Sequence, residues 1–232
     1  MSHFQFQTVS NIISGLGSIY ELKQLLQQQS FKKLLLVTDA GMIKQQLHLT
    51  IIEILETIQL DYVIYSSVQA DPPEHIVLDA VQFAKNEKVD IVLGFGGGSS
   101  LDVAKIIAIL AHSEQRQTLQ DLYGINNAKN PRLPLFLVPT TAGTGSEVTP
   151  ISIVTTGETT KTGIVSPVLF ADVAILDATF TQNLPAHITA ATGIDAMVHA
   201  IEAYTSKIKK NPYADMLAKQ ALRLLNNNLS LV

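Results

Sequence analysis

The sequence has 232 residues, with 16 Lys and Arg against 20 Asp and Glu, a net charge of −4, and no cysteine. These numbers exclude disulfides and thiolate metal ligands, and they disfavour nucleic acid as a partner because phosphate binding needs a basic surface. The sequence shows no run of about 20 apolar residues and no basic-then-apolar leader, so it predicts a cytoplasmic protein without a membrane span.

Strand-like and helix-like segments alternate along most of the chain. The expected strands are short, apolar and rich in β-branched residues, which is typical of strands buried on both faces of a sheet. They cover residues 34–37, 62–65, 91–93, 135–138 and 173–176. The helices expected among them cover residues 18–29, 41–59, 73–88 and 99–112. This alternation predicts an α/β fold in which helices cover both faces of a parallel sheet.

The pattern changes near residues 181–185. After this point only helices are expected, over residues 186–206 and 212–227. Strands and helices that separate along the chain in this way indicate separate domains. We therefore predict an α/β domain over residues 1–182 and the beginning of a helical domain over residues 183–232.

Residues 90–105 read as a strand, a glycine turn and a helix. The turn holds Gly96, Gly97 and Gly98, and Ser99 follows them. Glycines allow a ligand to approach the backbone closely, and a helix N-terminus offers unpaired N–H groups to an anion. The segment lacks the Lys-Ser/Thr pair of a P-loop and the usual two-strand dinucleotide fingerprint. It predicts a phosphate-binding loop, with a tight turn that binds no ligand as the alternative.

A second polar loop, residues 139–149, follows another apolar strand. The hydroxyls of Thr140, Thr141 and Thr144 are suited to ribose or phosphate oxygens, and Ser146 is expected to cap a helix or to face the ligand. An ordinary Ser/Thr turn is the alternative. Two such loops at the ends of parallel strands favour a ligand with two phosphates.

Asp39 ends the first buried strand of the α/β pattern. A carboxylate at such a strand end accepts hydrogen bonds from a ribose diol and repels a 2′-phosphate. It therefore favours NAD over NADP. The alternative is a turn aspartate before Gly41 with no ligand.

Asp195 and His199 are four residues apart in an expected helix and so share one face, with Glu202 nearby. The surrounding small and apolar residues predict that the pair is buried. A carboxylate and an imidazole suit Fe²⁺ or Zn²⁺. The alternative is an Asp–His hydrogen bond without metal, because a catalytic site usually takes about three protein ligands.

Taken in order, these motifs resemble the iron-containing (group III) alcohol dehydrogenase family. The matching positions are Gly96, Gly97, Gly98 and Ser99 with Asp102 and Lys105, then residues 139–147, 191–195 and 199–204. The resemblance implies a Rossmann-like α/β domain followed by an all-helical domain, in a dehydroquinate synthase-like architecture. It implies that the glycine loop binds the pyrophosphate of NAD and that the threonine loop lies along the cofactor.

The same resemblance implies roles for further residues. Asp39, Asp71, Ser99 and Asp102 belong to the cofactor site, and Lys161, in an expected turn over residues 160–163, lies near the nicotinamide. Asp195 and His199 are the first two metal ligands, with Fe²⁺ ahead of Zn²⁺. The implied reaction is reversible hydride transfer between an alcohol and NAD, with the metal as a Lewis acid. The intact family member is expected to be a homo-oligomer that acts on a small alcohol or aldehyde.

Two departures from the family pattern stand out. Asp71 occupies a position where the family usually has asparagine before proline. The two remaining metal-binding histidines of the family would lie beyond Val232, so the chain is expected to be a fragment or a truncated product. A non-catalytic dinucleotide-binding fragment or pseudoenzyme is therefore the main alternative, and a glycerol dehydrogenase-like relative is a further one.

Overall fold

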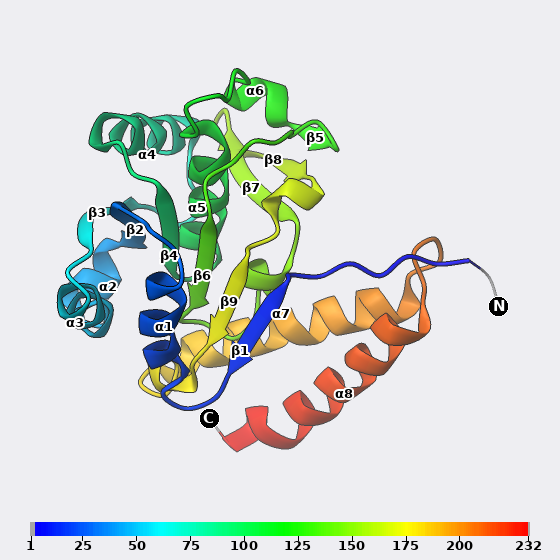
Figure 1. Ribbon diagram of the computed structural model, residues 1–232. Coiled ribbons are helices and arrows are strands. Elements are labelled where there is room, and N and C mark those ends of the chain that lie inside the picture. The colour runs from blue at the N-terminus through cyan, green and yellow to red at the C-terminus, as the bar shows by residue number, and fades with distance from the viewer. Residues whose placement is uncertain (1–2, 232) are drawn as a thin grey trace.

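The computed structural model describes residues 3–231. Six parallel strands form the main sheet in the order β1-β9-β6-β4-β2-β3 (Figure 1). Their bounds are β1 Asn11–Ser14, β2 Lys33–Asp39, β3 Asp61–Val68, β4 Ile91–Gly96, β6 Leu135–Pro139 and β9 Val173–Leu176. The five predicted strands are therefore confirmed, and β1, which was not predicted, extends one edge.

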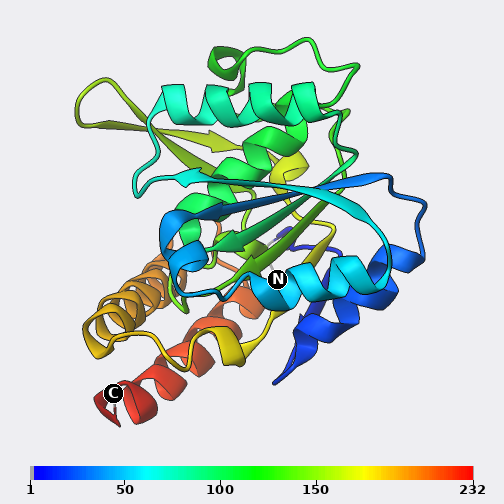
Figure 2. The same cartoon turned by 90° about the vertical axis from the view of Figure 1, so that its left-hand side faces the viewer.

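The β2 side chains show why the sheet is covered on both faces. Leu34 and Leu36 join one apolar core, while Leu35 and Val37 join the other, and all four are fully buried. Helices α1 (Glu21–Gln27) and α3 (Leu49–Thr57) pack on the first face, and α4 (Glu74–Glu87) and α5 (Gly98–Leu110) pack on the second. Figure 2 shows this layering from the side. The predicted α/β class is confirmed.

A small second sheet lies beyond α5. It contains β5 (Gly124–Ile125), β8 (Thr160–Val165) and β7 (Ile151–Thr156), with β7 and β8 antiparallel. The short helix α6 (Leu119–Leu122) precedes β5. Lys161 therefore lies within a strand, and the predicted turn over residues 160–163 is wrong.

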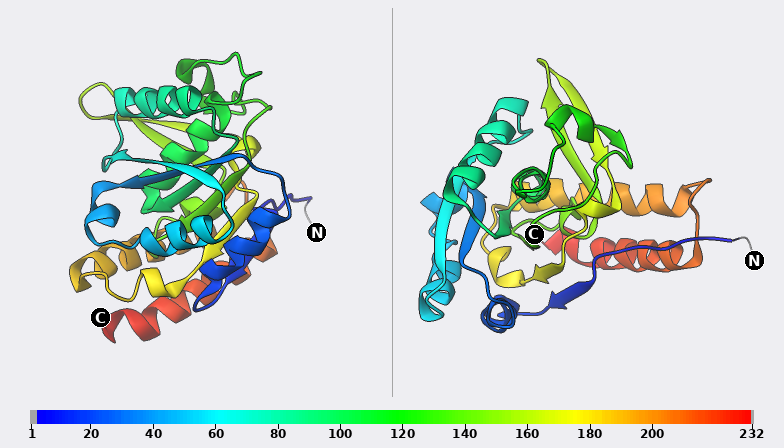
Figure 3. Two further views of the ribbon diagram at one scale, coloured as in Figure 1. Left: turned by 60° about the vertical axis from the view of Figure 1, so that its left-hand side comes forward. Right: turned by 45° about the horizontal axis from the view of Figure 1, so that its top comes forward.

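The last two helices, α7 (Ala186–Thr205) and α8 (Pro212–Asn228), pack side by side below the main sheet (Figures 1 and 3). The N-terminal segment runs alongside them, and Phe4 and Phe6 place their ring centroids 5.9 and 5.6 Å from that of Tyr213. Both helices leave apolar side chains exposed. This apolar surface of the helical pair includes Ile194, Val198, Ile201, Met216, Leu217 and Leu224.

The prediction of one continuous helix over residues 41–59 is wrong. Residues 41–59 form two helices, α2 (Ala40–Lys44) and α3, and Gln46 between them has a φ of 59°. Since that left-handed conformation cannot continue a right-handed helix, the chain turns there. Among residues 3–231, no helix combines the length and the apolar character that a bilayer crossing requires.

Candidate cofactor and metal site

The carboxyl ends of β2 and β4 meet at the point where the strand order reverses. After β2 the chain goes to β3 on one side, and it returns to β4 on the other. Open α/β sheets bind ligands in the crevice at such a switch point. Asp39 closes β2 and Gly96 closes β4, and the Ser100 hydroxyl lies 3.5 Å from Asp39 Oδ2. The predicted glycine loop and Asp39 are thus brought together at this crevice.

The glycine loop leads directly into α5. Among the described residues no side chain caps this 13-residue helix, so its first N–H groups face the crevice free of a side-chain partner. Gly96 has a φ of 146°, and a Cβ there would lie 2.8 Å from Ser100 Oγ. A Cβ on Gly98 would lie 3.0 Å from Thr144 Cγ2. The glycines therefore allow the two polar loops to approach each other around the helix start.

Asp39 is hydrogen-bonded within the protein through one carboxylate oxygen, Oδ1. Its Oδ1 accepts hydrogen bonds from the N–H groups of Gly41 at 2.8 Å and Met42 at 3.2 Å, so it caps α2. Its Oδ2 faces the crevice beside Ser100. The turn role considered for this aspartate is therefore present, and the choice between NAD and NADP stays a prediction.

The threonine loop adds the buried hydroxyl of Thr140 to this site. Thr140 is fully buried, and its N–H donates to the Gly96 carbonyl at 3.0 Å, which joins the two loops. Its hydroxyl has no hydrogen-bond partner among residues 3–231. A buried polar group without a partner is costly, so a ligand oxygen would satisfy it. Together with the uncapped helix, this fits a dinucleotide.

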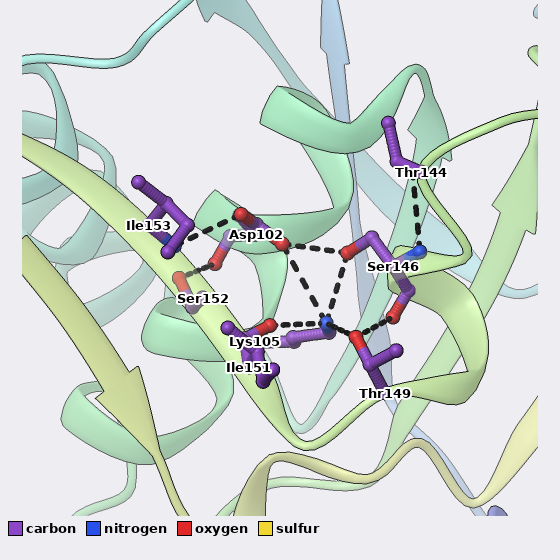
Figure 4. Close-up of polar contacts among 8 residues, drawn as sticks. All are labelled: Asp102, Lys105, Thr144, Ser146, Thr149, Ile151, Ser152 and Ile153. Carbon is purple, nitrogen blue, oxygen red and sulfur yellow. Dashed lines mark hydrogen bonds and ion pairs between the residues drawn. The ribbon is translucent and has the colours of Figure 1, made fainter. Parts of the chain in front are cut away.

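Beneath the two loops, a buried lysine holds them together (Figure 4). Lys105 Nζ, on α5, donates to Ser146 Oγ at 2.8 Å and to the Ile151 carbonyl at 2.6 Å. Ser146 Oγ in turn donates to Asp102 Oδ1 at 2.6 Å, and the Ile153 N–H donates to Asp102 Oδ2 at 2.9 Å. Ser146 thus bonds inside the protein and caps no helix within residues 3–231, so that part of its prediction is wrong, while a contact with the ligand stays a prediction.

Burial dominates the electrostatics of this network. It raises the pKa of the Asp102 carboxyl, against the opposing effect of Lys105, and it lowers the pKa of the Lys105 ammonium, against Asp102. Burial also raises the pKa of Glu147. Both Asp102 oxygens have partners within the protein, so this residue positions the loops, and its direct contact with a cofactor stays a prediction.

Asp71 and Lys161 lie at the rim of the same crevice. Lys161 Nζ is 2.6 Å from Asp71 Oδ1, and the Asp71 N–H donates to Ser99 Oγ at 3.3 Å. Asp71 adopts the left-handed conformation, with a φ of 51°. The structure therefore joins both residues, which were predicted separately, to the glycine loop.

Asp195 and His199 share one face of α7, with Asp195 Oδ2 3.5 Å from His199 Nε2. Their side chains are 45% and 55% exposed, so the predicted burial of this pair is wrong. Within residues 3–231, no group of three His, Asp or Glu side chains is placed to hold a metal ion. The described residues therefore offer two of the about three protein ligands that a catalytic metal takes.

Helix α7 passes close to the threonine loop. A Cβ on Gly143 would lie 2.5 Å from the Thr192 carbonyl oxygen, so the loop and the helix are in contact there. Asp195 and His199 lie three and seven residues beyond Thr192, and side chains at these spacings share a helix face. The pair thus lies on the face of α7 that passes the threonine loop.

Two family descriptions match this chain. The sequence model described as iron-containing alcohol dehydrogenase matches residues 10–178, and the model of the C-terminal region of the Fe-containing alcohol dehydrogenase family matches residues 189–232. These ranges contain the glycine and threonine loops in the first match and Asp195 and His199 in the second.

Individual proteins that the chain resembles are also alcohol oxidoreductases. A long-chain-alcohol dehydrogenase of Geobacillus thermodenitrificans is 40% identical over 216 residues, which are 93% of this chain and 54% of that protein. An NAD-dependent methanol dehydrogenase of Bacillus methanolicus is 36% identical over 218 residues, 94% of this chain and 56% of that protein. A solved 1,3-propanediol oxidoreductase superposes with a TM-score of 0.91 at 36% identity, covering 98% of this chain and 59% of that one. The chain therefore spans little more than half the length of these relatives.

Proposed function

Because the chain belongs to the iron-containing alcohol dehydrogenase family, we propose that the intact protein interconverts an alcohol and its aldehyde, with NAD as hydride carrier and a bound metal. The observation that carries this proposal is the crevice at the switch point, where an uncapped helix start lies between Asp39 and the orphan hydroxyl of Thr140. No other part of the described chain combines these anion-binding and ribose-binding features.

The cofactor roles follow from this geometry. The first N–H groups of α5 and the backbone of Gly96, Gly97 and Gly98 would bind the pyrophosphate. Asp39 Oδ2 would accept from the adenosine ribose and repel a 2′-phosphate. Hydroxyls of the threonine loop (Thr140, Thr141 and Thr144) would bond further cofactor oxygens. Bound NAD supplies the hydride acceptor, while these residues orient it.

We propose Asp195 and His199 as two of the metal ligands of the intact protein. The family description supports Fe²⁺ over Zn²⁺. When bound, the metal would polarise the alcohol oxygen as a Lewis acid. We also propose residues 1–182 as the cofactor domain and residues 183–232 as the beginning of the helical, metal-binding domain, with a small alcohol or aldehyde as the substrate and a homo-oligomer as the intact form.

A second function is a dinucleotide-binding protein without catalysis. It is favoured by one observation, that within residues 3–231 no group of three His, Asp or Glu side chains is placed to hold a metal ion. In this case NAD would bind, and no alcohol would be oxidised at any metal concentration.

Calorimetric titration of the purified chain with NAD, with and without Fe²⁺ or Zn²⁺, tests both functions. Metal-independent binding of NAD supports the cofactor site, and alcohol-dependent NADH formation in the presence of metal separates the enzyme from the binding protein. The variant Asp39→Asn, titrated with NADP, tests the ribose contact and is expected to bind NADP more tightly than the unchanged chain does. Absence of NAD binding would refute the proposed cofactor site.

A further inference from the structure

Asp71 contacts three elements through three different groups. Its N–H donates to Ser99 Oγ at 3.3 Å, next to the start of α5. Its carbonyl accepts from the Thr155 hydroxyl at 2.9 Å, on β7, and its carboxylate pairs with Lys161 on β8 at 2.6 Å. The residue therefore connects the small sheet to the edge of the glycine loop.

The backbone around Asp71 is held in place by further contacts. The Thr155 N–H donates to the Pro72 carbonyl at 2.9 Å, and Pro73 forms an isolated parallel bridge with Thr155. The backbone of Asp71 is thus held at the rim by bonds that do not depend on Lys161. The lysine, in contrast, reaches Asp71 through a flexible side chain.

The ion pair itself is open to solvent. The side chains of Lys161 and Asp71 are 55% and 64% exposed. Exposed pairs are weak and are screened by salt, so the ammonium can exchange one anionic partner for another at little cost. An anion that binds at the uncapped start of α5, beside Ser99, would present such a second partner.

From these contacts we propose that Asp71 competes with the phosphates of the dinucleotide for the Lys161 ammonium, and so lowers the affinity of this chain for its cofactor. The inference rests on the proposed NAD site. In the free protein the ammonium pairs with Asp71, and NAD binding must break that pair before Lys161 can contact the pyrophosphate. An uncharged side chain at position 71 would leave the Lys161 ammonium available to the phosphates, while the backbone contacts of residue 71 remain.

Four proteins test the competition: the unchanged chain, Asp71→Asn, Lys161→Met and the double variant. Each is titrated with NAD by calorimetry at about 10 mM and at about 1 M salt, where the Debye length falls from about 30 to about 3 Å. Glu87→Gln is the control, because it removes the same charge from a partly exposed pair, Lys33–Glu87, at the opposite end of β2. Asparagine accepts a left-handed φ readily, so the Asp71 backbone is expected to persist.

We expect Asp71→Asn to bind NAD roughly two- to fivefold more tightly at low salt, which is the strength of an exposed ion pair, and to lose most of this gain at high salt. In the Lys161→Met background the same change is expected to leave the affinity for NAD unchanged, because the cation for which Asp71 and the phosphates compete is absent. Glu87→Gln is expected to bind like the unchanged chain.

Two results would overturn the inference while leaving the NAD site in place. One is unchanged or weaker NAD binding by Asp71→Asn. The other is an equal gain in both backgrounds, which would mean that Asp71 repels the phosphates directly and not through Lys161. If none of the proteins bound NAD, the proposed cofactor site would fail, and this inference would fail with it.

Discussion

Replacement of Lys105 by methionine tests whether the buried network holds the two loops together. Methionine keeps most of the volume of the side chain and removes its charge. Because the lysine side chain is fully buried, solvent does not screen its interactions. The change deprives Ser146 and the Ile151 carbonyl of a donor, and it leaves the Asp102 carboxylate without its cation at 3.5 Å.

Removing one partner of a buried ion pair typically costs about 3–5 kcal/mol, since the other charge stays buried without compensation. That is a large part of the about 5–15 kcal/mol that stabilises an ordinary domain. The variant Lys105→Met/Asp102→Asn removes both charges. We expect it to regain a substantial part of the lost free energy of unfolding, which separates charge from packing.

The loss should depend on pH. Burial already raises the pKa of Asp102, and without Lys105 nothing of opposite charge lowers it. The folded state then takes up a proton at a higher pH than the unfolded state, so folding is favoured as the pH falls through the folded pKa. The deficit of Lys105→Met is therefore greatest at pH values above the raised pKa of Asp102, and it shrinks as the pH falls through that pKa.

Urea unfolding of the three proteins, followed by circular dichroism at several pH values, measures these differences. A cost below about 1 kcal/mol for Lys105→Met would place the network in the range of exposed pairs and refute the reasoning. A deficit that does not change with pH would show that the carboxylate is not the source of the cost.

Further changes probe the helical pair. Gly143→Ala places a methyl group against the Thr192 carbonyl and should lower the free energy of unfolding by about 1–3 kcal/mol in the same urea assay. Gly163→Ala is the control and should cost less, because its Cβ would meet only Ile153 Cδ1, at 3.6 Å. The exposed apolar surface of the helical pair should make the chain self-associate, so light scattering should give a mass above the 25.2 kDa of one chain. Met216→Glu combined with Leu217→Glu should reduce that mass. A monomer at every protein concentration would contradict the prediction of self-association.

The strands of the main sheet were predictable because both of their faces are buried. Continuous apolar runs such as Leu34–Val37 have few other structural explanations in a short segment. The small sheet was missed because the first half of β8, Thr160, Lys161 and Thr162, is polar, and the first two of these residues are exposed. Its pairing with β7 depends on register across a hairpin, and local composition does not reveal that.

The site was predictable in its motifs and less so in its contacts. The glycine and threonine loops were placed correctly because each follows a buried strand, and parallel strands bring their carboxyl ends together. The contact between Lys105 and Ser146 joins residues 41 positions apart and was not predicted. Lys105 is the one polar residue among residues 103–110, and this is a signal of its burial. The exposure of Asp195 and His199 was missed because it depends on what packs over α7.

Helix α5, which begins at the candidate cofactor site, is a deeply enclosed support of that site. Ten of its 13 residues are buried, and it lies between the two sheets, in contact with β4, β6 and β7. Its amides should exchange with solvent only when the whole domain opens, while the more exposed α7 and α8 open in smaller, cheaper steps. The end of the molecule at which we propose phosphate binding is therefore expected to belong to its slowest-exchanging unit, so it would bind a ligand without first having to become ordered.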